Sequence, residues 1–207
     1  MLTDIREITS FKVKPYLSYE AFLQQYMGYH AEWENGEVIV FMAASRKHQL
    51  LVLWLSQVLN IFVQSYDLGV MLIAPFNMKL AMLKRGREPD ILFVSQARQH
   101  LIQENHLAGA ADLVIEIVSP ESVERDRVKK MAEYEAAGVA EYWLIDPETE
   151  QAEFYQLSNI GQYQLISPDI HGMYHSSVLT GLELEVAWLW LEPLPKVLDV
   201  ARAWRLV

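Results

Sequence analysis

One stretch, Asp112 to Pro120, constrains the fold of this 207-residue chain more than any other, because it is almost wholly apolar. It reads Asp-Leu-Val-Ile-Glu-Ile-Val-Ser-Pro, a pattern typical of a strand that is buried on both faces. The centre of this strand carries one acid, Glu116. A buried carboxylate is costly unless it is paired, so Glu116 requires a cation or a metal ion beside it. An ion pair with an arginine such as Arg87 or Arg127 is the simpler of these alternatives.

A second acid, Asp90, enters another apolar segment. The sequence from Glu88 to Val94 reads Glu-Pro-Asp-Ile-Leu-Phe-Val and predicts a strand with an acid at its start. Two acids on neighbouring core strands form a pattern that suits a divalent cation. Carboxylates without Cys or paired His favour Mg²⁺ or Mn²⁺ over Zn²⁺. Taken alone, Asp90 is equally consistent with a residue that caps a turn after Pro89.

The rest of the chain predicts a single α/β domain with a central mixed sheet, hairpins at both ends and at least two main helices. Ser18 is placed to cap a first helix, and Asn35-Gly36 is a strong signal for a two-residue hairpin turn. Gly138 is placed to end a helix that begins near Glu124. The expected helices are 19–26, 50–62 and 124–137, with short helices in 187–207; the expected strands are 70–80, 89–94, 141–146, 151–157, 161–167 and 177–186, with a solvated basic turn at 84–87 and irregular chain at 95–111.

Composition limits the function classes. The chain has no cysteine, which excludes disulfides and thiolate metal sites and suits a cytoplasmic location. No apolar stretch is long enough to span a bilayer, and the first residues show no secretory signal. The formal charge of −10 argues against nucleic-acid binding, but residues 131–207 carry −9 of it and residues 1–130 only −1. Nucleic-acid binding is therefore permitted.

The segment after the Glu116 strand predicts a helix with three chemically active side chains on one face. Asp126, Lys130 and Tyr134 follow each other at intervals of four residues, so they lie on the same side of the helix. That face can return over the carboxylates, where an ammonium would stabilise charge on a phosphate. The alternative for Asp126 and Lys130 is a solvated salt bridge, and Tyr134 is read as a packing residue.

With these residues in place, the chain resembles the PD-(D/E)XK restriction-endonuclease-like superfamily. Within it, the chain looks most like the Uma family, bacterial proteins named as restriction endonucleases. The resemblance runs from about Leu17 to about Val186, within a single domain of residues 1–207. It rests on the Asp90 and Glu116 segments and the helix after them, and on Glu32 to Glu37, Arg46-Lys47-His48 and Gly138 to Pro147.

The resemblance implies Mg²⁺- or Mn²⁺-dependent hydrolysis of DNA, with Asp90 and Glu116 as metal ligands. The superfamily lysine stands two residues after the second acid, where this chain has Val118. Lys130 from the following helix is therefore expected to replace it. The same resemblance makes Glu32 an additional catalytic acid and places His48, Asp126 and Val118 along the site.

The resemblance and the tryptophan-rich tail suggest a homodimer. Two other functions stay open at this point. One is a catalytically inactive, nuclease-derived binding or assembly module, which the acidic charge and Val118 favour. The other is a metal-dependent hydrolase of smaller phosphate esters.

Overall fold

The strands form two six-stranded sheets and one two-stranded sheet in a computed structural model, which describes residues 10–13, 16–26, 28–41, 45–120 and 122–207. The first residues, used above to exclude a secretory signal, lie outside these ranges. The central sheet has the order β12 (Tyr163–Leu165), β11 (Gln151–Leu157), β10 (Glu141–Asp146), β9 (Leu113–Ile117), β7 (Ile91–Ser95) and β4 (Gly69–Ile73). The second sheet has the order β1 (Ser10–Val13), β3 (Glu37–Phe41), β2 (Ala31–Glu34), β6 (Arg85–Arg87), β5 (Asn77–Leu80) and β8 (His106–Leu107).

The central sheet is mixed, as predicted. Strands β9 and β10 run parallel, with Ile115 opposite Trp143, whereas β7 and β9 run antiparallel, with Ile91 opposite Ile115. A parallel pair requires a crossover, and the helical segment between β9 and β10 supplies it. The predicted α/β class with a central mixed sheet is thereby confirmed.

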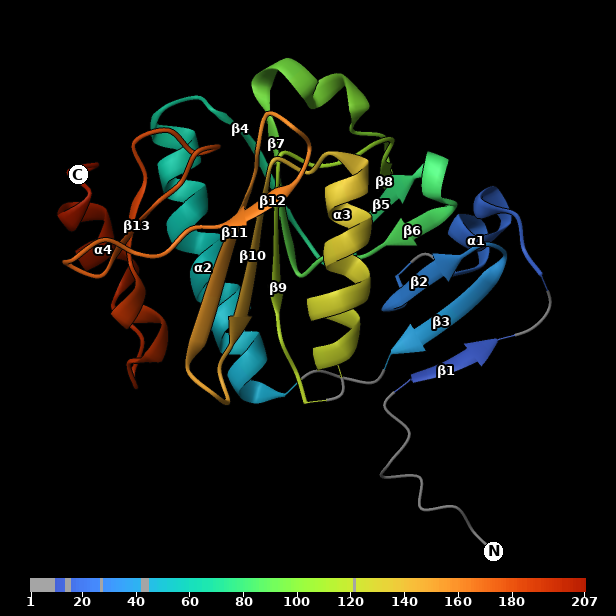
Figure 1. The fold of residues 1–207 in the computed structure, drawn as a ribbon, viewed down its shortest axis with the longest axis horizontal. Coiled ribbons are helices and arrows are strands. Elements are labelled where there is room, and N and C mark those ends of the chain that lie inside the picture. The colour runs from blue at the N-terminus through green and yellow to red at the C-terminus, as the bar shows by residue number, and fades with distance from the viewer. Residues whose placement is uncertain (1–9, 14–15, 27, 42–44, 121) are drawn as a thin grey trace, which may run out of the picture.

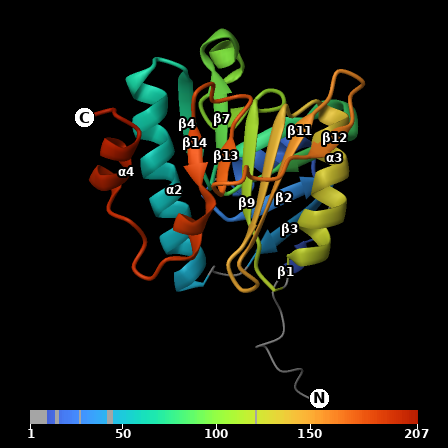
Figure 2. The ribbon, with the colours of Figure 1, turned by 60° about the vertical axis from the view of Figure 1, so that its left-hand side comes forward.

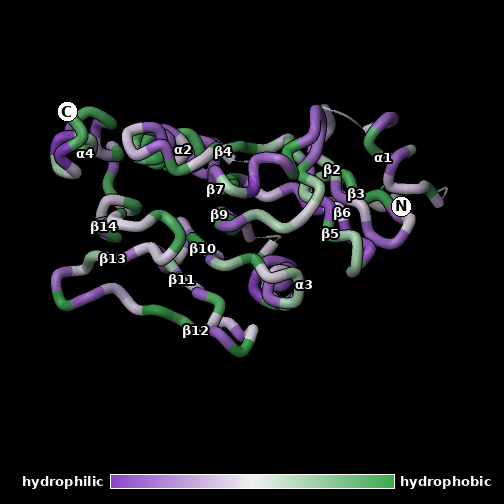
Figure 3. The backbone as a smooth tube through the Cα atoms, turned by 90° about the horizontal axis from the view of Figure 1, so that it is seen from above, coloured by the Kyte–Doolittle hydropathy of each residue, from purple (hydrophilic) through white to green (hydrophobic). Residues whose placement is uncertain are grey.

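Helices cover both faces of the central sheet (Figures 2 and 3). Helix α2 (Arg46–Ser65) lies on one face and α3 (Met131–Ala137) on the other. Side chains alternate between these faces along each strand, so Ile115 and Ile117 pack with α2 while Val114 and Val118 pack with the α3 side. Both faces are therefore apolar, which explains the continuous apolar run of β9.

The second sheet and α1 (Tyr19–Tyr26) lie at the end of the molecule opposite α4 (Val197–Ala203) and the C-terminus (Figure 1). The predicted strand over 70–80 is wrong, because the chain breaks around Pro75 and places β4 and β5 in different sheets. The predicted basic turn at 84–87 is also wrong. Residues Arg85–Arg87 form strand β6, which pairs with both β2 and β5. The chain then crosses from β6 into β7, and Asp90 lies in this crossing.

Several local predictions are confirmed. The Ser18 Oγ accepts a hydrogen bond from the Ala21 amide at the start of α1. Asn35 and Gly36 join β2 and β3 with φ of 47° and 98°, as the hairpin turn requires. Gly138 ends α3 at φ 79°. The predicted strand over 177–186 is reduced to β14 (Glu183–Glu185), which pairs with β13 (Met173–His175). Short helical segments follow, as predicted: a 3₁₀ turn at Val186–Trp190 and then α4.

Candidate active site

Glu116 lies near the end of β9 and is only 4% exposed. Since side chains alternate along a strand, Glu116 shares its face with Val114 and Val118, toward the helical segment that follows. That segment begins with a π-helical turn, Arg125–Lys130, and continues as α3. Single π-helical turns occur frequently at functional sites.

The π-helical turn brings Lys130 to Glu116. The Lys130 Nζ lies 2.8 Å from Glu116 Oε1, 3.0 Å from Glu32 Oε1 and 3.6 Å from Asp126 Oδ1. The Tyr134 hydroxyl donates to the same Glu116 oxygen at 2.7 Å. Asp126, Lys130 and Tyr134 therefore share one face, as the sequence predicts. All three are buried, so the alternative of a solvated salt bridge is wrong.

Asp90 lies beside this group. Its Oδ2 accepts a hydrogen bond of 2.7 Å from the Ile117 amide, the residue directly after Glu116. The same oxygen lies 3.1 Å from His48 Nε2, in the first turn of α2, where the Ser45 side chain caps the helix by accepting from the His48 amide. The His48 Nδ1 is buried and finds no hydrogen-bond partner among the described residues.

A cavity of about 520 Å³ lies at this group of side chains, between the two sheets. Of the residues that the sequence suggests, Glu32, His48, Asp90, Glu116 and Lys130 line it. Asp126 is buried behind Lys130 and does not lie on the described wall. Val118 was expected along the site, but the structure places it in the apolar cluster of the α3 side, away from the cavity wall.

The charges in this cavity interact strongly. Burial raises the pKa of Glu116 to about 8; Lys130 opposes this shift, and the carboxylates of Asp126, Asp90 and Glu32 add to it. Burial also disfavours the charged form of Glu32, but Lys130 and Arg87 outweigh it and hold the pKa of Glu32 far below its ordinary value.

Lys130 is charged. Burial lowers its pKa, but the attraction of Glu116 and Glu32 is larger and raises it above the ordinary value. It therefore acts as a cation that donates hydrogen bonds and not as a base.

Three titratable residues of the described cavity wall are absent from the sequence prediction: His30, Glu88 and Arg125. His30 Nδ1 lies 2.5 Å from Glu88 Oε1. Burial opposes the charged form of His30, yet Glu88 raises its pKa. The Arg125 guanidinium lies 4.3 Å from the centre of the Phe41 ring and its Nε lies 3.3 Å from Asp126 Oδ1. The basic run from Arg125 to Lys130 is the sequence signal that could have found Arg125.

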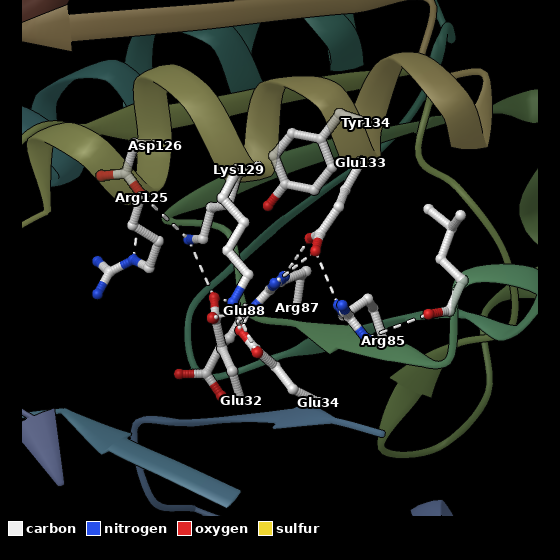
Figure 4. Close-up of polar contacts among 12 residues, drawn as sticks. Glu32, Glu34, Arg85, Arg87, Glu88, Arg125, Asp126, Lys129, Glu133 and Tyr134 are labelled. Carbon is white, nitrogen blue, oxygen red and sulfur yellow. Dashed lines mark hydrogen bonds and ion pairs between the residues drawn. The ribbon is translucent and has the colours of Figure 1, made fainter. Parts of the chain in front are cut away.

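Arg87 departs most from the sequence prediction at this site, because it was expected in a solvated turn and is wholly buried. Figure 4 shows its polar contacts. Its Nη1 lies 2.7 Å from Glu32 and 2.8 Å from Glu34, while its Nε and Nη2 contact Glu133 at 2.7 and 2.8 Å. Strand β6 turns this side chain inward, between the hairpin and α3.

The predicted alternative for Glu116, a pair with Arg87 or Arg127, is wrong. Lys130 occupies that position, and Arg127 pairs with Asp146 and Glu153.

Comparison with known proteins places this chain in a family. The family model of Uma2, described as "Putative restriction endonuclease", matches residues 16–187. The chain belongs to the Uma2 family. The resemblance to the Uma family in the sequence is confirmed, and the Uma2 family assignment supports a nuclease-like function.

A solved structure supports the Uma2 fold. It is described as that of "a putative nuclease belonging to DUF820" from Anabaena variabilis ATCC 29413. The two chains are 18% identical and superpose with a TM-score of 0.70 over 84% of this chain and 97% of that one. At this identity the likeness shows a common fold. No curated protein matches the Uma2 chain. No helix in the described ranges is long and apolar enough to cross a membrane.

Proposed function

We propose that this protein is a divalent-metal-dependent endonuclease that hydrolyses phosphodiester bonds in DNA. The observation that carries the proposal is the position of Lys130, whose Nζ lies within 3.0 Å of both Glu116 and Glu32. The chain lacks a lysine two residues after Glu116, and the helix supplies an ammonium to the same carboxylate. Asp90 lies directly before the adjacent strand β7, and its carboxylate accepts a hydrogen bond from the Ile117 amide.

The donor set fits a hard divalent cation. In the described part of the chain, no three His, Cys, Asp or Glu side chains are arranged to hold a metal ion. Mg²⁺ needs only one or two carboxylates because it retains several waters, so Asp90 and Glu116 suffice. The described cavity wall also carries four acids against two fixed cations, Arg125 and Lys130, and burial raises the pKa of one of these acids, Glu116, so a divalent ion would take the place of its proton. When bound, Mg²⁺ would offset the charge of the phosphate and make water more acidic.

The side chains of the cavity have distinct roles in this proposal. Asp90 and Glu116 would hold the ion, and Glu32 keeps Lys130 charged and in place. Lys130 orients the attacking water by hydrogen bonding and stabilises the developing charge on the phosphate. Arg125, held against Phe41, is placed to contact a phosphate oxygen. The water oxygen bonds to phosphorus and gives up one proton to solvent, the bond from phosphorus to one sugar oxygen breaks, and that oxygen takes up one proton from solvent and leaves as a hydroxyl.

The test is cleavage of plasmid DNA by the purified protein with Mg²⁺ or Mn²⁺. We expect cleavage by the wild type and none by Asp90→Ala or Asp90→Asn. The asparagine keeps an oxygen that can accept from the Ile117 amide, so loss of activity in Asp90→Asn reports the lost charge and not a lost fold. Asp199→Asn, on the exposed side of α4, is the matched control and should cleave normally. Cleavage that persists in Asp90→Asn contradicts the assignment.

A protein that binds Mn²⁺ but neither binds nor cleaves DNA would instead be an inactive module derived from a nuclease, which the charge of −10 would suit. We further propose that the chain forms one domain with its core at about 17–186, and that it forms a homodimer, which light scattering can test.

A further inference from the structure

A second cavity of about 250 Å³ adjoins the candidate active site. The two cavities share Gly28, Pro75 and Glu88 in their walls, so they are immediate neighbours. The second cavity lies between α1 and the segment that leads into β5. We call it the aromatic pocket, because its wall includes four aromatic side chains, Phe22, Tyr26, Tyr29 and Phe76.

The rings of this pocket offer flat apolar surface to a planar ligand. Phe22 and Tyr26 are stacked, with centroids 6.0 Å apart, and Tyr29 meets Tyr26 edge-on at 6.0 Å. Tyr29 keeps 59% of its surface exposed at the mouth of the pocket, so its ring is accessible to a ligand. An exposed ring beside a polar site is a suitable stacking surface for a nucleobase.

The polar groups of the pocket exclude a phosphate and favour a neutral ligand with N–H donors. The described wall contains two acids, Glu88 and Glu104, and no lysine or arginine. Asn77 also lines the pocket and is 5% exposed. Its Oδ1 accepts from the Tyr19 hydroxyl at 2.6 Å, while its Nδ2 has no hydrogen-bond partner within the described residues. Buried donors are rarely left without a partner, so an acceptor from a ligand would complete this group.

We infer that the aromatic pocket receives one unstacked nucleobase of the nucleic acid whose phosphate lies in the adjoining cavity. The inference rests on the proposed nuclease function and adds a base-binding subsite to it. A base supplies the flat apolar face that the rings need, the N–H groups that a carboxylate accepts and a carbonyl or ring nitrogen for Asn77. Only a single-stranded or extruded nucleotide can present its base in this way.

The test combines a protein change with a substrate change. Tyr29→Ala removes an exposed ring, and we expect it to lower kcat/KM on a single-stranded oligonucleotide by about tenfold to a hundredfold. Tyr29→Phe keeps the ring and should stay within about twofold of the wild type. Tyr66→Ala is the matched control, because Tyr66 is 55% exposed and lines a different cavity.

The substrate change replaces one base at a time near the cleaved bond by an abasic unit. At the position whose base enters the pocket, the abasic unit should lower the rate of the wild-type protein as much as Tyr29→Ala lowers the rate on the intact substrate. The Tyr29→Ala protein should cleave this abasic substrate no more slowly than it cleaves the intact one. The inference is overturned if the two losses add, or if Tyr29→Ala cleaves normally. Such results would not contradict the proposed nuclease function, which is tested separately by the loss of cleavage in the Asp90 variants. Absence of any cleavage or nucleic-acid binding by the wild type would overturn the proposed function and the subsite together.

Discussion

Replacement of Glu116 by glutamine tests the electrostatic cost of the candidate metal site. Burial, with the nearby carboxylates, raises the pKa of Glu116 from 4.5 to about 8. A carboxyl with a raised pKa stabilises the folded state fully below about pH 4.5, and this contribution is lost as the pH rises through 8. Glutamine resembles the protonated acid and does not titrate. The wild type should therefore lose stability with rising pH relative to Glu116→Gln.

The size of this effect follows from the shift. Each pKa unit corresponds to about 1.4 kcal/mol, so the stability difference should grow by about 1.4 kcal/mol per pH unit between pH 5 and 7.5. Over that range the Glu116→Gln protein gains roughly 3 kcal/mol over the wild type. Lys130 keeps Glu32 as a partner at 3.0 Å, so the variant does not leave the ammonium unpaired.

The measurement is urea unfolding at a series of pH values in the presence of a chelator. Glu183→Gln, an exposed acid on β14, is the control and should show no such pH-dependent difference from the wild type. Parallel stability curves for Glu116→Gln and the wild type would refute the reasoning. They would mean that Glu116 is ionised in the folded protein at every pH tested.

Two further predictions follow from the same charges. Mn²⁺ affinity, measured by calorimetry, should rise about tenfold per pH unit up to about pH 8 and then level off, because the ion displaces the Glu116 proton; a flat profile would contradict this. Arg87→Met should lower the free energy of unfolding by about 3–5 kcal/mol, because it removes a buried cation from three carboxylates. Arg202→Met, which breaks an exposed pair, should cost less than about 1 kcal/mol.

The features that the sequence predicts well are those with a local cause. The β9 strand follows from its apolar run, and the shared face of Asp126, Lys130 and Tyr134 follows from helical spacing. The turn at Asn35-Gly36 and the helix end at Gly138 follow from backbone preferences for positive φ.

The features that the sequence does not predict depend on partners far along the chain. Arg87 is surrounded by Glu34 and Glu133, which lie 53 and 46 residues away, so its burial has no local signal. The break between β4 and β5 is an exception, because Pro75 is a local signal for it: proline is rarely found inside a strand. The role of β6 as a strand emerges only when both of its neighbours are in place.

Because Val118 stands where a strand lysine would otherwise lie, the fold and the candidate site depend on the same helix. It lies two residues after Glu116 on the same face of the chain, but it packs among apolar side chains such as Val114 and Tyr142. A lysine on the strand would hold its distance to Glu116 by the strand geometry alone. Lys130 instead reaches Glu116 only while its helix is docked on the sheet. Tyr134 and Glu133 maintain that docking through Glu116 and Arg87, so contacts that stabilise the helix also set the position of the proposed catalytic ammonium.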